Sequence, residues 1–365
     1  MSARHLSTES GYTITELLVS TAIMITVTGS IFGLMNPAQG SGQTQPEVAD
    51  MQQRMRVGSD VLFKELVISG AGPYQGATTG SLINFFAPIL PRRTGRNAAD
   101  PTQGPNSFKS DAITLSYIPN SYSQTTISNN MPQVAAELKV FDQPNCPRGR
   151  ELCGFEEGMQ VIIFDTSGNF DTFVITEVQD EAGHLQHRQQ PLNFPYASGA
   201  QVTQIVSNTY YLNRTTNQLM RYNGAEEELA LVDNVVDLRF DYFGDPAPPR
   251  FPQPPPGTAN CLYDGGGNYI GPPPLAADAG SLASLPAAIL TDGPYCGSGA
   301  NEFDADLLRI RKVRVSLRVQ ASLSTLRGPD TNLFIKPGSA LAGERTLPDY
   351  RVSFEVSPRN LNLAR

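Results

Sequence analysis

The feature that most constrains this chain is an uncharged apolar segment close to its start. Residues 17–35 contain no charged side chain, and a helix of about nineteen residues is long enough to cross the hydrocarbon layer of a bilayer. An ordinary secretory signal has a small-residue cleavage site after its apolar core, and none follows this segment. We therefore predict a transmembrane helix over residues 12–36, preceded by a short polar leader, residues 1–11.

One acidic residue lies at the edge of this apolar segment. Glu16 is expected in the first turn of the predicted helix, one turn after Tyr12. A carboxylate at membrane depth costs free energy and is usually paired or functional. The simplest structural explanation is the favourable interaction of a first-turn carboxylate with the positive end of the helix macrodipole.

The sequence G-Y-T-I-T-E-L-L at residues 11–18 resembles the class III signal of type IV prepilins. This resemblance implies that a prepilin peptidase cleaves between Gly11 and Tyr12 and methylates the new amine of Tyr12. It also implies that Glu16 contacts the terminal ammonium of a neighbouring subunit during filament assembly. Two departures from the family pattern are Tyr12, where the family usually has Phe, and the acidic Glu9 in the leader.

A second resemblance covers about half of the chain. Five stretches, in this order, resemble the PilW-type minor pilins and the related J-type minor pseudopilins of type II secretion: 208–213, 217–224, 228–244, 310–323 and 350–363. Residues 75–110 and 246–299 have no counterpart and are interpreted as insertions. The resemblance implies a minor pilin that joins or primes type IV pilus assembly, in a tip or initiation complex.

The implied partners are the prepilin peptidase, other minor pilins, the major pilin and the inner membrane, with no nucleic acid. The implied location is the bacterial inner membrane, crossed once, and later the pilus at the cell surface, with the globular domain outside the cytoplasm. Two other interpretations stay open. One is a minor pseudopilin of a type II secretion system, and the other is a membrane-anchored adhesin or binding module.

Residues 37–72 are predicted to form a joint and a second, amphipathic helix. Four helix-breaking residues occur within ten positions: Pro37, Gly40, Gly42 and Pro46. Thr44 and Glu47 then match a T-x-x-E capping box, which predicts a fresh helix start. A stripe at helical spacing follows and is expected to pack on a sheet, with the helix ending near residues 70–72: Met51, Met55, Gly58, Leu62 and Leu66.

The remainder, residues 73–365, is predicted to be a β-rich domain, so the fold class is α+β. Alternating apolar and polar residues predict these strands: 112–118, 137–141, 159–164, 170–178, 208–212, 218–222, 236–242, 313–323 and 350–356. We expect antiparallel sheets with one packed face each. A Pro- and Gly-rich insertion, residues 246–299, interrupts this pattern.

The four cysteines form two pairs that are close in sequence, Cys146 with Cys153 and Cys261 with Cys296. Their spacing does not match that of zinc sites. Two disulfides in an oxidising compartment are the better interpretation, although three pairings are possible. The four cysteines are therefore not expected to hold a cofactor or metal.

No catalytic or nucleotide-binding motif occurs, and the chain is not predicted to be an enzyme or to bind a cofactor or metal. The formal net charge of −8 argues against nucleic-acid binding. His184 and His187 are expected to be a solvated pair. Glu302, Asp304 and Asp306 could ligate calcium, but a solvated acidic stretch is the preferred interpretation.

Overall fold

The computed structural model describes residues 11–72, 81–95, 107–119, 123–143, 146–224, 228–278, 280–297, 301–341 and 343–363, and it describes only the backbone of residues 34–43. Residues 1–10 of the predicted leader therefore lie outside the described residues. The chain divides into two compact units. Unit 1 comprises Met1–Gln52 and Ala321–Pro348, and unit 2 comprises Gln53–Gln320 and Asp349–Arg365.

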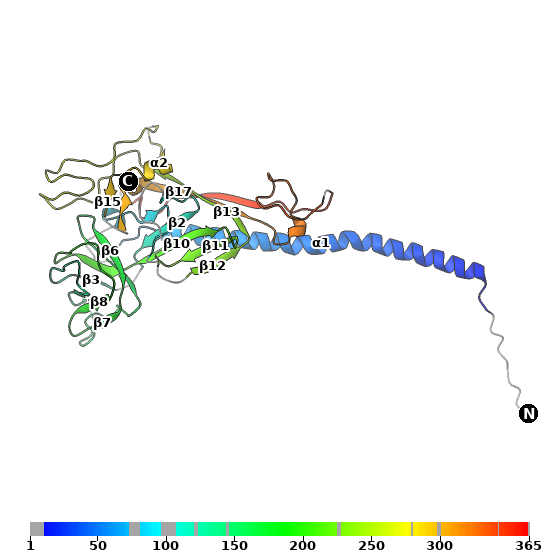
Figure 1. Ribbon diagram of the computed structural model, residues 1–365, viewed down its shortest axis with the longest axis horizontal. Coiled ribbons are helices and arrows are strands. Elements are labelled where there is room, and N and C mark those ends of the chain that lie inside the picture. The colour runs from blue at the N-terminus through cyan, green and yellow to red at the C-terminus, as the bar shows by residue number, and fades with distance from the viewer. Residues whose placement is uncertain are drawn as a thin grey trace, which may run out of the picture. The chain divides into compact units, whose positions relative to one another are not determined.

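A single long helix, α1 (Ile14–Ile68), replaces the two predicted helices (Figure 1). The predicted break near Pro37 and Pro46 is therefore wrong, and so is the predicted helix start at Thr44. A proline removes one backbone donor and can kink a helix, at a cost of about 3 kcal/mol, but it does not oblige a long helix to end. Two prolines nine positions apart leave most backbone hydrogen bonds of a 55-residue helix in place.

Helix α1 ends where the glycines near residue 70 predict. Gly70 has φ +75°, a left-handed conformation that glycine adopts without strain. Its backbone N–H donates a hydrogen bond to the carbonyl of Ser116, outside the helix, at 2.9 Å. The predicted end of the amphipathic helix is confirmed.

Unit 2 contains antiparallel sheets, which confirms the α+β fold class. The first sheet has the order β1 (Ile89–Leu90), β2 (Ala112–Tyr117), β10 (Val206–Asn213), β11 (Gln218–Tyr222) and β12 (Glu228–Asp233). The second sheet has the order β14 (Ala283–Ser284), β13 (Val235–Gly244), β17 (Ile310–Val319) and β18 (Tyr350–Val356). Figure 1 shows β10, β11 and β12 as neighbouring strands.

Two smaller sheets of unit 2 share a hydrophobic core. They have the orders β3 (Gln124–Thr126), β9 (Gln201–Gln204), β5 (Gln160–Phe164), β6 (Phe170–Val174), and β4 (Glu137–Lys139), β8 (His184–Gln186), β7 (Glu177–Gln179). The predicted strand over residues 170–178 is therefore two strands in different sheets, because the chain crosses between sheets after Val174. Fully buried side chains fill this core: Ile127, Leu138, Val161, Ile163, Phe173, Leu185 and Val202.

The remaining described elements are short. They are β15 (Tyr295–Cys296), paired with β16 (Phe303–Asp304), the helix α2 (Ala287–Leu290), and the 3₁₀ helices η1 (Leu82–Asn84), η3 (Ala305–Arg309) and η4 (Ser324–Leu326). Of these, η4 belongs to unit 1 and the others to unit 2.

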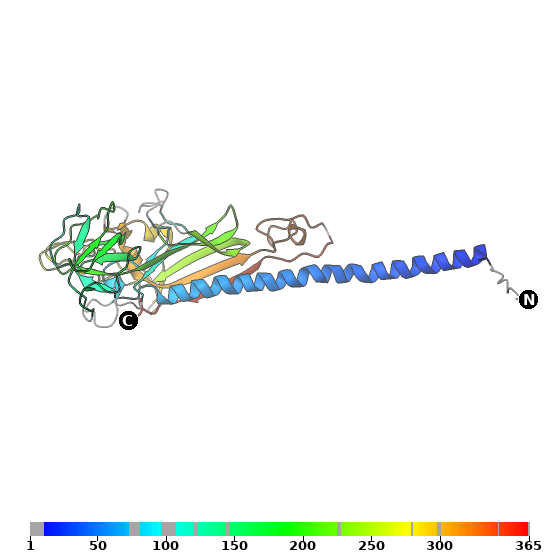
Figure 2. The same cartoon turned by 90° about the horizontal axis from the view of Figure 1, so that it is seen from below.

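The last turns of α1 pack on both large sheets of unit 2 (Figure 2). A Cβ atom on Gly58 would lie 2.8 Å from Leu317 of β17, and Val232 of β12 is also in contact range. Leu62 and Leu66, one and two turns further on, are fully buried. The predicted packing of this stripe on a sheet is confirmed, and Gly58 allows the helix backbone to approach the sheet closely.

Candidate functional site

The N-terminal part of α1 has the composition of a membrane span. Among the described residues, one segment, Ile14–Gly33, is long and apolar enough to cross a membrane, with a mean hydropathy of 1.6. None of it is buried in the protein. Large apolar side chains are exposed all along it, including Leu17, Leu18 and Met24. A surface of this kind needs a lipid or protein neighbour, and it fits a membrane anchor or signal.

Glu16 completes a capping box at the start of this segment. Its Oε2 atom accepts hydrogen bonds from the backbone N–H and the hydroxyl of Thr13, each at 2.9 Å. In return, the Glu16 backbone N–H donates to the Thr13 hydroxyl at 3.3 Å. This reciprocal pairing satisfies two N–H groups that have no partner within the helix. The T-x-x-E sequence at residues 13–16 is a local signal for this cap, of the same kind as the T-x-x-E sequence at residues 44–47.

The residues before the helix are accessible. Gly11, Tyr12 and Thr13 are not helical, and the Tyr12 side chain is 91% exposed. Glu16 is also exposed, and its Oε1 atom accepts no hydrogen bond from the described part of the chain. The candidate cleavage and assembly residues therefore lie together in the first turn and the short segment before it.

The second T-x-x-E sequence has a different environment within unit 1. Thr44 and Glu47 lie inside α1, and both are buried. The Oε1 atom of Glu47 accepts hydrogen bonds from the backbone N–H and the hydroxyl of Ser322, at the start of the connection between β17 and β18. Glu47 is thus a tertiary anchor for residues 321–348 and not a helix cap.

Both predicted disulfides are present. Cys146 is bonded to Cys153, and Cys261 is bonded to Cys296. The second bond spans 35 residues and closes most of the insertion at residues 246–299. A bond over a loop of this length is expected to stabilise the fold by about 3–4 kcal/mol in the chain-entropy treatment.

Asp304 and Asp306, before β17, are buried and Glu302 is half-buried, which corrects the prediction that this acidic stretch is solvated. Asp304 accepts hydrogen bonds from the backbone N–H of Gly293 and of Asp306, at 2.6 and 2.7 Å. Asp306 pairs with the fully buried Arg309 at 2.6 Å. Burial raises the pKa of Asp304 to about 6 and of Asp306 to about 7. The three-residue spacing between Asp306 and Arg309 in the sequence could have predicted this ion pair.

This buried pair holds the proline-rich insertion. Arg309 donates hydrogen bonds to the carbonyls of Pro246 and Pro273, which lie at two different points of the insertion. Carboxylate oxygens of Asp292, Asp304 and Asp306 lie within 4.8 Å of one another, a spacing that a cation could use. Because Arg309 already supplies positive charge to this group, the arrangement is explained as a structural ion pair.

The two histidines are not a solvated pair, which is a further correction. His184 lies on β8, half-buried, 3.5 Å from the carboxylate of Glu137. His187 is fully buried, and its Nδ1 atom lies 2.8 Å from the carbonyl oxygen of Gln190. Burial lowers the pKa of His187. The two rings therefore have separate environments and form no common ligand set.

The chain matches no known protein-family model, and no curated protein matches its sequence.

Proposed function

We propose that this chain is a minor pilin that joins or primes type IV pilus assembly after cleavage between Gly11 and Tyr12. The observation that carries the proposal is the arrangement at the start of α1. An accessible Gly11–Tyr12 bond is followed within one turn by Glu16 and then by an apolar helix with no buried residue. A prepilin peptidase needs the first feature, and a filament built from packed helices needs the other two.

The electrostatic part of the proposal concerns Glu16. Cleavage creates an ammonium group on Tyr12, and the partner's ammonium meets the Oε1 atom of Glu16 as one subunit docks beside another. Two opposite charges about 4 Å apart attract by roughly 4 kcal/mol at an effective dielectric constant of about 20, before desolvation is subtracted. A net gain of about 1–2 kcal/mol would favour docking several-fold or more.

The rest of the chain supports the proposed compartment. Two disulfides favour an oxidising compartment for unit 2, and the apolar segment anchors the subunit in the inner membrane before assembly. Other minor pilins and the major pilin are the proposed partners. A minor pseudopilin of type II secretion would use the same segment in the same way.

The first experiment tests processing. We expect Gly11→Asp to leave the leader attached, because the peptidase must accommodate the residue before the cut. Mass spectrometry of the membrane-extracted protein measures this, with Ser7→Asp in the leader as the matched control. Normal maturation of the Gly11→Asp protein would contradict the proposal.

The second experiment separates assembly from helix capping, since Glu16 can serve both. Glu16→Gln removes the charge, whereas Thr13→Ala removes the capping hydroxyl and keeps the charge. We expect Glu16→Gln to be inserted and cleaved but to reduce the number of pili and the co-purification of other minor pilins, while Thr13→Ala assembles normally. Equal loss in both variants would assign Glu16 to capping. Pili intact but secretion lost in a Glu16→Gln strain would favour the secretion-system pseudopilin.

A further inference from the structure

We propose that a cleft in unit 2, centred on Leu308, binds a peptide that presents an apolar side chain next to a carboxylate. The cleft has a volume of about 540 Å³, within the range of ligand-binding pockets. Four segments that are distant in sequence line it: η1, the first residues of the insertion, the junction of η3 with β17, and residues 360–363. This site does not depend on the proposed pilin function.

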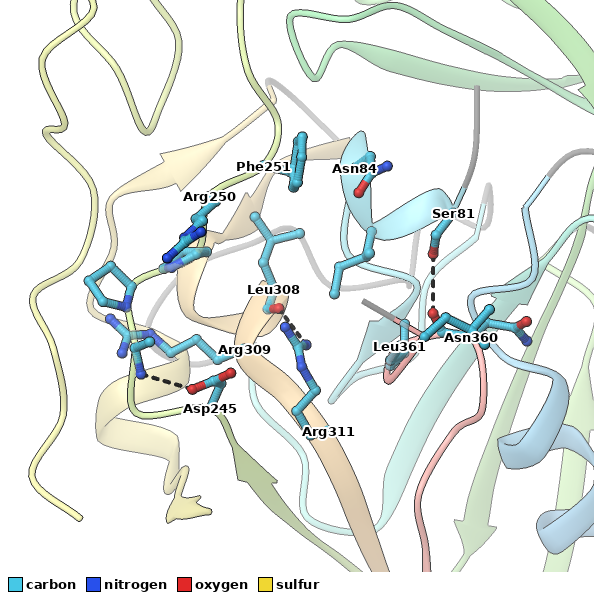
Figure 3. A pocket seen from close by; sticks show the side chains of 15 residues that line it. Ser81, Asn84, Asp245, Arg250, Phe251, Leu308, Arg309, Arg311, Asn360 and Leu361 are labelled. Carbon is cyan, nitrogen blue, oxygen red and sulfur yellow. Dashed lines mark hydrogen bonds between the residues drawn. The ribbon is translucent and has the colours of Figure 1, made fainter. Parts of the chain in front are cut away.

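The cleft has an apolar floor and an apolar rim. Leu308 and Leu361 form the floor and are 1% and 5% exposed. Phe251 and Leu363 lie on the rim and are 42% and 67% exposed. Figure 3 shows Leu308 at the centre, between Arg250 on one side and Leu361 on the other. An apolar side chain that enters the cleft would cover this exposed apolar surface.

The charge of the cleft is opposite to that of the whole chain. The described lining residues include three arginines and one aspartate, a formal charge of +2 in a protein whose net charge is −8. Arg309 is paired with Asp306, and Arg311 donates to the carbonyls of Leu308 and Ile310. Arg250 is exposed, and its side chain forms no ion pair or hydrogen bond within the described part of the chain.

These properties select the ligand. The guanidinium of Arg250 is the group that would meet a carboxylate, because arginine presents paired donors to it. The side-chain amide of Asn84 also lines the cleft and has no hydrogen-bond partner among the described residues. An amide is both donor and acceptor, which suits a peptide bond and not an aliphatic chain. A peptide therefore satisfies the cleft better than a fatty acid does.

The wall that carries Arg250 is held in position before any ligand arrives. The Tyr263 hydroxyl donates to the carbonyl of Arg250 at 3.0 Å, and the Asn260 amide donates to the carbonyl of Pro252 at 2.9 Å. Arg309 donates a hydrogen bond to the carbonyl of Pro246 at 3.0 Å, and the Cys261–Cys296 disulfide closes the segment. Such preorganisation reduces the ordering cost of binding. In this proposal, the first residues of the insertion form one wall of the binding site.

The test uses the full-length protein in detergent and three probes. They are a fluorescein-labelled Gly-Ser-Gly-Ser-Leu-Phe peptide with a free C-terminal carboxylate, the same peptide with a C-terminal amide, and dodecanoate as competitor. We expect the carboxylate peptide to bind at least 10-fold more tightly than the amide peptide by fluorescence polarisation. Dodecanoate is expected to displace it weakly. Equal binding of the two peptides, or displacement by dodecanoate at lower concentration than by unlabelled peptide, would overturn the proposal.

The variants locate the binding. We expect Arg250→Gln to weaken binding of the carboxylate peptide about 10-fold and to leave the amide peptide unchanged. Phe251→Ser should weaken both peptides. Arg148→Gln, which removes an exposed arginine from the Cys146–Cys153 loop, is the control and should change neither. Arg250 is exposed, so its replacement is expected to leave the melting temperature unchanged; unaltered binding in Arg250→Gln would refute the site.

Discussion

Helix α1 has two apolar regions that relate to the protein in opposite ways. Along Ile14–Gly33 large apolar side chains lie on every side of the helix, between polar residues such as Ser20 and Thr21, and none of the segment is buried. Near its end, the buried apolar residues follow one face, where Leu62 and Leu66 are fully buried, whereas Val57 and Phe63 lie on other faces and are exposed. Helices apolar on one face pack on a domain, whereas helices apolar all round need a surrounding apolar medium. A buried stripe along one face distinguishes the second region from the first.

The two T-x-x-E sequences of the same helix also differ in the hydrogen bonds that their glutamates accept. Thr13 and Glu16 bond to each other at the helix start. Glu47, inside the helix, bonds to Ser322 instead. A capping box pairs with backbone N–H groups of the first helical turn, which have no carbonyl partner within the helix, so the motif has its capping function only where a helix begins.

The largest expected effect separates the two apolar regions. Leu62→Ala should destabilise unit 2 by about 2–5 kcal/mol, because it removes a fully buried side chain and leaves a cavity. Leu18→Ala, at a position that is 61% exposed, should leave that stability unchanged. Denaturant unfolding of the detergent-solubilised protein, followed by tyrosine fluorescence, measures both. Similar losses in the two variants would show that the first region also packs on the protein.

The next effect separates the two glutamates. Glu47→Ala leaves the backbone N–H of Ser322 without its acceptor, which we expect to cost about 1–3 kcal/mol. The loss should be local, so hydrogen exchange of residues 321–348 should become faster while exchange in the two large sheets stays the same. Glu16→Ala is the matched change and should leave exchange in residues 321–348 unaltered. No change in Glu47→Ala would mean that the connection is held by its other contacts.

A smaller effect compares two glycines. Gly58→Ala places a Cβ atom 2.8 Å from Leu317, so the helix or the leucine must shift. We expect a net destabilisation of about 1 kcal/mol, since overpacking exceeds the gain in helix propensity. Gly29→Ala meets nothing within 4 Å and should not destabilise the protein. Thermal unfolding of the two variants side by side decides between these outcomes, and a stabilised Gly58→Ala protein would contradict the close approach.

The sequence predicted those parts of the structure that repeat a short pattern. Strands β11 and β18 have the predicted bounds, because alternation on a half-buried strand is visible in the sequence. The continuity of α1 past Pro46 was not predictable from the sequence. A proline indicates a local loss of helix stability, but the sequence around it does not show how stable the neighbouring helical turns are. The burial of Asp306 depends on Arg309 and on two distant prolines. The cleft at Leu308 draws on four separate segments and has no local pattern at all.

The smallest expected effect is a pH dependence in the domain-packing end of α1. Burial raises the pKa of Glu65 above its ordinary value of 4.5, while Asn208, Tyr210 and Arg221 partly oppose this. The folded state therefore binds the proton of the Glu65 carboxyl group more tightly than the unfolded state does. The contribution of this proton to the free energy of unfolding is complete below pH 4.5 and is lost as the pH rises through the raised pKa. Glu65→Gln is neutral at every pH and should escape this loss. We expect the variant and the wild type to unfold at equal denaturant concentration near pH 4, and the variant to be the more stable by less than about 1 kcal/mol at pH 8. A difference that is constant between pH 4 and pH 8 would show that burial does not control the ionisation of Glu65.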